Sequence, residues 1–101
     1  MYKIKGIYHN GRKGPRMEPV TDAKYDGLAG CRILWDISEL KQFKSTTFKI
    51  IDDFFGSWRW YTSEVLQLTK RDGKIYELET ANTIYELEEL DGDELLSDDQ
   101  K

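Results

Sequence analysis

The chain has 101 residues, and its 19 acidic and 15 basic side chains give a formal charge of −4. A chain this short forms one domain and has little room for a deep pocket. The single cysteine excludes an intrachain disulfide and favours a reducing compartment, so we expect a cytoplasmic protein. No apolar run reaches the roughly 20 residues that span a bilayer, and the N-terminus lacks a signal-peptide core, so no membrane partner is expected.

The charge is divided unevenly along the chain. Residues 1–16 hold no acid and five basic groups, which are Lys3, Lys5, Arg12, Lys13 and Arg16. Residues 91–101 hold five acids and one lysine, so residues 1–90 are neutral as a whole. The last segment has only two leucines to bury, too few to offset the entropy of ordering. We therefore expect a single domain at 1–90 and a disordered acidic tail at 91–101.

Alternating side chains predict the first strands. Tyr2, Ile4 and Tyr8 alternate with polar residues and predict a strand with one buried face. Glycine and proline among basic residues over 9–16 indicate an exposed loop. A second strand is expected over 28–35, with Gly30 at a bend. Its buried face would carry Cys31, Ile33 and Trp35.

The middle of the chain begins with a different pattern. Asp36 followed by Glu39 predicts a capped helix of one or two turns, through Leu40 and Phe43. Strands are expected again over 45–51 and 57–61, where β-branched and aromatic residues return.

The C-terminal part predicts a three-stranded meander over 66–70, 74–80 and 83–90. Asp72-Gly73 would supply the positive-φ residues of a two-residue hairpin turn. Asn82 would adopt the left-handed region in the second bend. One face of the meander is apolar, and the opposite face is acidic. The acidic residues are Glu77, Glu79, Glu86 and Glu88.

About six short strands with closely spaced turns indicate a mostly all-β chain. The architecture we predict is a small antiparallel, partly open SH3-like barrel with at most one short helix. Like charges directly opposite one another across strands are unfavourable. We therefore expect the glutamates to meet Lys70, Lys74 or the basic groups of a partner.

The C-terminal hairpin carries a pattern of small polar residues: Thr62-Ser63-x-Val65, an Asp-Gly turn, and then Thr80-x-Asn82-Thr83-x-Tyr85-x-Leu87. This pattern resembles the C-terminal module of small, uncharacterised proteins of bacteria and their phages. The resemblance covers about a quarter of the chain and carries no catalytic residue. It implies a β-barrel module and an origin in a phage or mobile element.

The signals for chemistry are weak. His9 is the one histidine and is expected to be an ordinary surface residue, and Cys31 is expected to be a small buried hydrophobe. Asp52-Asp53 is better explained by a turn than by a cation site, because neighbours on a strand face opposite ways. The acids of 91–101 lack the spacing of a calcium loop. No catalytic residue, metal site or cofactor is therefore predicted.

The aromatic stripe over 57–61 has two interpretations. Trp58 and Trp60 fall on one face of the strand, and Arg59 and Tyr61 fall on the other. In the first interpretation the tryptophans complete a ring-rich core, and Arg59 and Tyr61 cover its edge. In the second, the latter pair forms an exposed patch with Phe54 or Phe55, since Tyr, Trp and Arg dominate binding hot spots.

Three classes of function follow, in descending order of support. The first is a non-enzymatic protein-binding module, with the aromatic patch as its anchor and the acidic face or tail on a basic partner. A specific form is a phage inhibitor of a host defence protein, in which carboxylates imitate phosphates. The second is nucleic-acid binding through the N-terminal basic arm, which the neutral domain disfavours. An enzyme comes last, because no acid, base and nucleophile converge.

Overall fold

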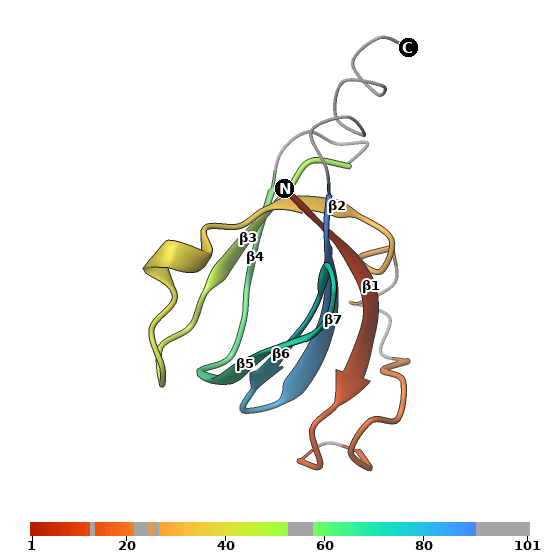
Figure 1. The fold of residues 1–101 in the computed structure, drawn as a ribbon. Coiled ribbons are helices and arrows are strands. Elements are labelled where there is room, and N and C mark those ends of the chain that lie inside the picture. The colour runs from red at the N-terminus through yellow and green to blue at the C-terminus, as the bar shows by residue number, and fades with distance from the viewer. Residues whose placement is uncertain (13, 22–24, 26, 53–57, 91–101) are drawn as a thin grey trace, which may run out of the picture.

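In the computed structural model one antiparallel sheet makes up the fold, and the structure describes residues 1–12, 14–21, 25, 27–52 and 58–90. Within these residues the sheet has seven strands in the order β4-β3-β2-β1-β7-β6-β5, and it curls without closing (Figure 1). A mostly β, partly open antiparallel fold is thus confirmed, whereas the SH3-like assignment stays a prediction. The strands are β1 (Tyr2–His9), β2 (Arg32–Leu34), β3 (Thr47–Ile50), β4 (Trp58–Tyr61), β5 (Val65–Asp72), β6 (Ile75–Thr80) and β7 (Thr83–Glu89).

A bulge divides β1, the central strand. Its pairing with β7 shifts register between Ile4 and Gly6, so the alternation of inward and outward side chains is reset. After the bulge Ile7 is buried and Tyr8 is only half-buried. The expectation that Tyr8 shares the buried face of Tyr2 and Ile4 is therefore wrong.

The second strand is shorter than predicted. Residues 28–30 form a turn, because Gly30 has a φ of +94°, which strand residues do not adopt. The inward face of the strand is nevertheless as expected, with Cys31, Ile33 and Trp35 all buried.

The predicted helix is a single 3₁₀ turn, η2 (Ile37–Glu39). Asp36 caps it, since its carboxylate accepts a hydrogen bond from the Ser38 N–H at 2.9 Å. The chain then runs beside the start of β5. Phe43 N–H donates to the carbonyl of Val65 at 2.7 Å, and Val65 N–H donates to that of Lys44 at 2.9 Å.

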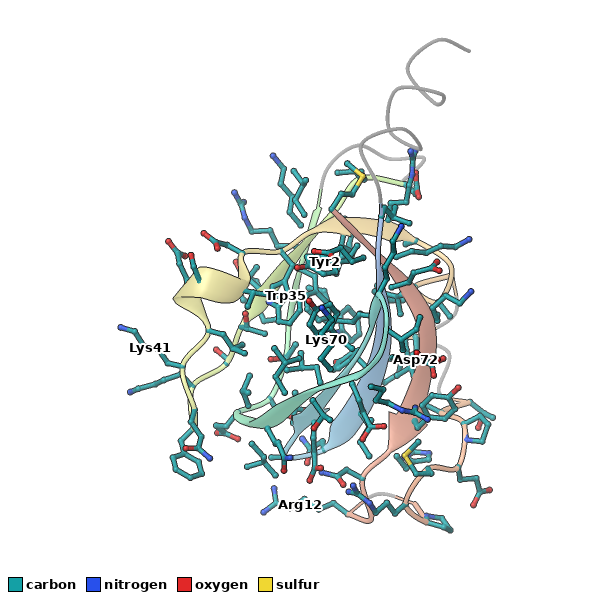
Figure 2. The ribbon with its side chains drawn as sticks, viewed as in Figure 1. Tyr2, Arg12, Trp35, Lys41, Lys70 and Asp72 are labelled. Atoms are coloured by element: carbon teal, nitrogen blue, oxygen red, sulfur yellow. The ribbon has the colours of Figure 1, made fainter. Side chains whose placement is uncertain are left out.

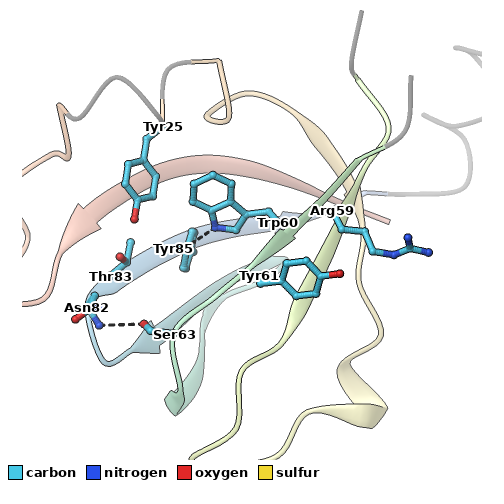
Figure 3. Close-up of a pocket in the computed structure, with 8 residues that line it drawn as sticks. All are labelled: Tyr25, Arg59, Trp60, Tyr61, Ser63, Asn82, Thr83 and Tyr85. Carbon is cyan, nitrogen blue, oxygen red and sulfur yellow. Dashed lines mark hydrogen bonds between the residues drawn. The ribbon is translucent and has the colours of Figure 1, made fainter. Parts of the chain in front are cut away.

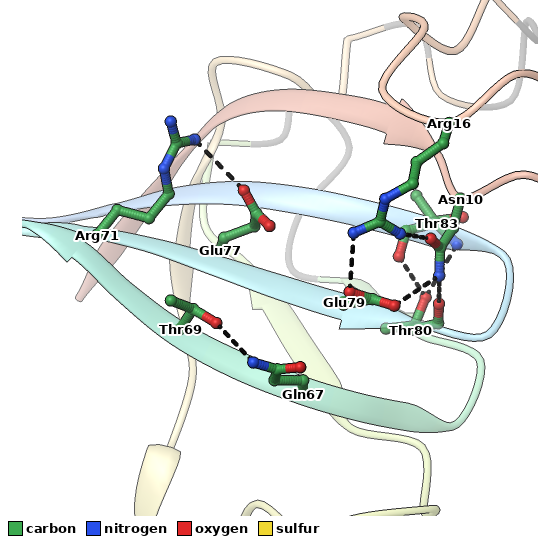
Figure 4. Close-up of polar contacts among 9 residues, drawn as sticks. All are labelled: Asn10, Arg16, Gln67, Thr69, Arg71, Glu77, Glu79, Thr80 and Thr83. Carbon is green, nitrogen blue, oxygen red and sulfur yellow. Dashed lines mark hydrogen bonds and ion pairs between the residues drawn. The ribbon is translucent and has the colours of Figure 1, made fainter.

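Both hairpin turns differ in detail from the prediction. Asp72 pairs with Ile75 inside the ladder, so the β5–β6 loop is Gly73-Lys74, and only Gly73 has positive φ. Asn82 does not have positive φ either. Instead, the Thr80 hydroxyl donates to the Thr83 carbonyl at 2.7 Å and accepts from its N–H at 3.1 Å, which closes the β6–β7 turn (Figure 4).

The core is a chain of rings between the two arms of the curled sheet. Edge-to-face contacts join Tyr2 to Trp35, Trp35 to Phe48, and Phe48 to Tyr85, with ring centroids 5.2–5.5 Å apart. Tyr2 and Trp35 lie inside the curl, whereas Lys41 and Arg12 point away from it (Figure 2). Such pairs add to the stability that the burial of apolar area supplies.

Candidate functional site

The aromatic stripe predicted over 57–61 is divided between the two faces of β4, with Trp60 on one face and Arg59 and Tyr61 on the other. Arg59 and Tyr61 are exposed on the outer face, and the Tyr61 side chain has a relative exposure of 67%. Trp60 faces inward and packs against the core. Phe54 and Phe55, the other members of the predicted patch, lie outside the described residues.

A pocket of about 390 Å³ lies beside β4 (Figure 3). Its aromatic walls are Tyr25, Trp60 and Tyr85. The Tyr25 and Trp60 rings lie 5.0 Å apart, and the Trp60 Nε1–H donates to the Tyr85 hydroxyl at 2.9 Å. The remaining lining residues are Arg59, Tyr61, Ser63, Asn82 and Thr83. The pocket therefore spans from β4 to the β6–β7 turn, across the opening of the curled sheet.

The deepest ionisable group of the pocket is Tyr85, which is 1% exposed. Its burial raises the pKa of the phenol far above the ordinary value, and the hydrogen bond from Trp60 offsets only part of this effect. An ordinary tyrosine is already protonated at neutral pH, so the raised pKa extends the protonated state of the Tyr85 hydroxyl to higher pH.

β4 is an edge strand of the described sheet, so only every second residue along it bonds to β3 through its backbone. Thr62 N–H donates to the Thr46 carbonyl at 3.0 Å, so position 62 and, by the period of two, position 60 bond toward β3. The N–H and C=O groups of Arg59 and Tyr61 then point away from β3. Among the described residues no backbone hydrogen bond meets this edge.

Two like charges face one another on the outer side of the same strands. Lys49 lies directly opposite Arg59 in the β3–β4 ladder. This pair is of the non-hydrogen-bonded type, in which side chains come closest. Both side chains are exposed, and no salt bridge joins either one to a carboxylate of the described residues. Directly opposed like charges are unfavourable, so this position favours an anionic neighbour.

The acidic face lies on the other half of the sheet. Glu77 and Glu86 are directly opposite one another, and Arg71 bridges them at 3.3 and 3.4 Å. The contact of Arg71 with Glu77 is drawn in Figure 4. Arg16 binds Glu79 at 3.1 Å, and the Lys5 ammonium lies 4.0 Å from a Glu88 oxygen. The sequence predicts Lys70 as one of the possible partners of these glutamates, but the Lys70 ammonium lies over the Tyr76 ring, 5.6 Å from the centroid.

The N-terminal basic residues that the structure describes are distributed over β1 and the loop after it. Lys3 and Lys5 lie on β1, at the centre of the sheet, and Lys5 approaches the acidic face. Arg16 donates to Asn10 as well as to Glu79. Arg12 is exposed, and Lys13 lies outside the described residues. Of the four cations that the structure describes, Lys5 and Arg16 are thus engaged with carboxylates of the same chain.

The remaining candidates have structural roles. His9 is half-buried, and its ring lies against Gly14. Cys31 is buried, as predicted, and its thiol lies 2.8 Å from the Gly27 carbonyl oxygen. Asp52 accepts hydrogen bonds from the Arg32 guanidinium and from the Arg32 N–H, and this pairing holds the pKa of the carboxyl below its usual value. Asp53 lies outside the described residues.

Sequence reasoning missed most of the pocket. Tyr25 lies in a segment without periodicity, and Tyr85 was expected only as a core residue. The opposition of Lys49 to Arg59 depends on the register of β3 against β4, which the turn signal at Asp52-Asp53 does not fix. The alternation over 57–61 did find the exposed pair on β4.

Comparisons with protein-family models, with curated proteins and with solved structures find no match. The resemblance of the C-terminal hairpin to phage proteins therefore stays a prediction. No three histidine, cysteine or acidic side chains in the described ranges are grouped so that they could hold a metal ion. Nor does the described part of the chain contain a helix that is long and apolar enough to span a membrane.

Proposed function

We propose that the chain is a non-enzymatic protein-binding module whose contact surface is the outer side of β3 and β4. The observation that carries this proposal is the exposure of Arg59 and Tyr61 together, beside a pocket walled by aromatic rings. Exposed Tyr and Arg side chains around a partly apolar recess are typical of the residues that dominate binding energy.

The other surfaces support the proposal less well. The glutamates of β6 and β7 share ion pairs with Arg71, Arg16 and Lys5, which lowers the net negative charge of that face. An inhibitor that imitates phosphates with these carboxylates, from a phage or a mobile element, stays a more specific prediction. The same ion pairs reduce the positive charge that nucleic-acid binding through the N-terminal segment would need.

A capture experiment with matched variants tests the proposed surface. Immobilised wild-type chain would be exposed to a lysate of the source cells, beside the Arg59→Ala and Tyr61→Ala variants and a Lys41→Ala control from the loop after η2. We expect one or more proteins to be retained by the wild type and the control and to be lost with either β4 variant. Because both side chains are exposed, the thermal midpoint of the variants should stay close to that of the wild type.

Equal retention by all four chains would contradict the assignment of the surface. A large loss of stability in both variants would place Arg59 and Tyr61 among the groups that hold the fold together, which would remove the argument for a contact surface.

A further inference from the structure

We infer that the outer edge of β4 binds an extended acidic segment of a partner protein, which pairs with it as an additional strand. This inference rests on the proposed function, because it specifies how the same surface engages its partner. It also goes further, because it names the backbone of β4 as a recognition element and states the charge of the partner.

The backbone N–H and C=O groups of β4 that point away from β3 suit pairing with a peptide strand. Arg59 and Tyr61 each direct one N–H and one C=O away from β3, at the two-residue spacing of a ladder. An exposed edge of this kind pairs readily with another polypeptide. A nucleic acid does not offer donors and acceptors alternating at this spacing, so the edge favours a peptide.

The side chains specify what the added strand carries. A residue opposite Arg59 would lie on the outer face, next to the unfavourable pair of Arg59 and Lys49. A carboxylate there would relieve the repulsion between the two cations. A residue opposite Trp60 would point inward, toward the aromatic walls of the pocket. The chemistry that fits is an alternation of acidic and apolar side chains.

Amide hydrogen exchange of the full chain gives the first test. In the free protein, the N–H groups of Arg59 and Tyr61 should exchange fast, whereas those of Trp60 and Thr62 should be protected by their bonds to β3. Slow exchange at Arg59 and Tyr61 that does not depend on concentration would show that the chain itself covers the edge. Protection that grows with concentration would show that a second copy covers it. Either result would overturn the inference.

The probe for binding is a blocked pentapeptide, Glu-Leu-Glu-Leu-Glu. We expect it to slow exchange at Arg59 and Tyr61 and to shift the Trp60 indole N–H resonance in a titration. The peptide with lysine in place of glutamate should not bind, and the peptide N-methylated at its glutamate amides should lose binding because it cannot donate to the edge. Equal binding of the N-methylated peptide would overturn the pairing of backbones, even if Arg59 and Tyr61 still contribute to capture of a partner.

Four variants separate the backbone contribution from the charge. Tyr61→Pro removes the N–H that points outward and is compatible with an edge strand, so it should abolish binding of the peptide, whereas Tyr61→Val keeps this N–H, loses only the ring, and should bind the peptide more weakly than the wild type but measurably. Lys49→Gln should weaken binding about twofold to fivefold, as expected for one exposed ion pair. Lys41→Gln should leave it unchanged. Retention of single-stranded RNA in place of the acidic peptide would overturn the assignment of the partner.

Discussion

At the scale of single residues, the pair of Arg32 and Asp52 joins the start of β2 to the second residue after β3. Asp52 receives the Arg32 N–H at 2.7 Å and the guanidinium Nη2 at 2.7 Å. The carboxylate thus has charge-assisted hydrogen bonds to both the backbone and the side chain of one residue. This geometry explains why its pKa lies below the usual 3.8.

This pair predicts a pH-dependent contribution to stability. Because the folded state lowers the pKa of Asp52, the contribution is present above the pKa of the unfolded chain and is lost as the pH falls through the folded pKa. We expect Asp52→Asn to lower the free energy of unfolding by about 0.5–1 kcal/mol at neutral pH, and by progressively less as the pH falls below about 4. Urea unfolding across this range measures the difference.

The Arg32→Gln variant supplies the control for Asp52. In the Arg32→Gln background, Asp52→Asn should lower the free energy of unfolding by less, because the Asp52 carboxylate has already lost the Arg32 guanidinium. A difference that keeps its size at low pH would mean that Asp52 acts through packing rather than through charge.

At the scale of secondary-structure elements, the bulge in β1 lets Ile7 face inward and brings the Tyr8 ring over Gly6. A Cβ atom placed on Gly6 would lie 2.5 Å from the Tyr8 hydroxyl oxygen and 2.9 Å from its Cε2. Because Gly6 has no side chain, the Tyr8 ring can lie over it. β1 is the central strand and joins the two halves of the sheet.

We expect Gly6→Ala to destabilise the fold by about 0.5–1.5 kcal/mol, because the tip of the half-buried Tyr8 ring must leave its position. The same change in a Tyr8→Ala background should cost much less, since no ring is then displaced. Denaturant unfolding of the four chains gives the coupling between the two positions. Equal costs in both backgrounds would show that the backbone at Gly6, and not the contact with Tyr8, is what matters.

At the scale of the whole molecule, charge separates the leading function from nucleic-acid binding. Residues 1–90 have no net charge, and the cations of the N-terminal segment include two that pair with carboxylates. We expect no retention of the full chain on single-stranded DNA at about 0.15 M salt, because phosphate neutralisation supplies most of such affinity. If the wild type is tightly retained on single-stranded DNA and the Lys13→Glu, Arg16→Glu double variant is not, nucleic-acid binding would become the better-supported function.

The parts of this architecture that sequence could predict are those set by local alternation. The inward faces at Cys31, Ile33 and Trp35 and the capped turn after Asp36 follow from side chains within a few positions of one another. The bulge that redirects Tyr8 could not be predicted, because it depends on the pairing of β1 with β7. The salt bridge of Arg32 with Asp52 likewise exists only once strands distant in sequence are in register.

The opposed cations Lys49 and Arg59 on β3 and β4 also affect whether the chain associates with itself. An unpaired strand edge ordinarily invites self-association and fibre growth. If two copies joined edge to edge along β4, both Arg59 side chains and both Lys49 side chains would crowd onto one continuous sheet face. Their mutual repulsion would oppose such a dimer, most strongly at low ionic strength, where charges are least screened. The same charges that oppose pairing with a second copy would favour pairing with an acidic strand.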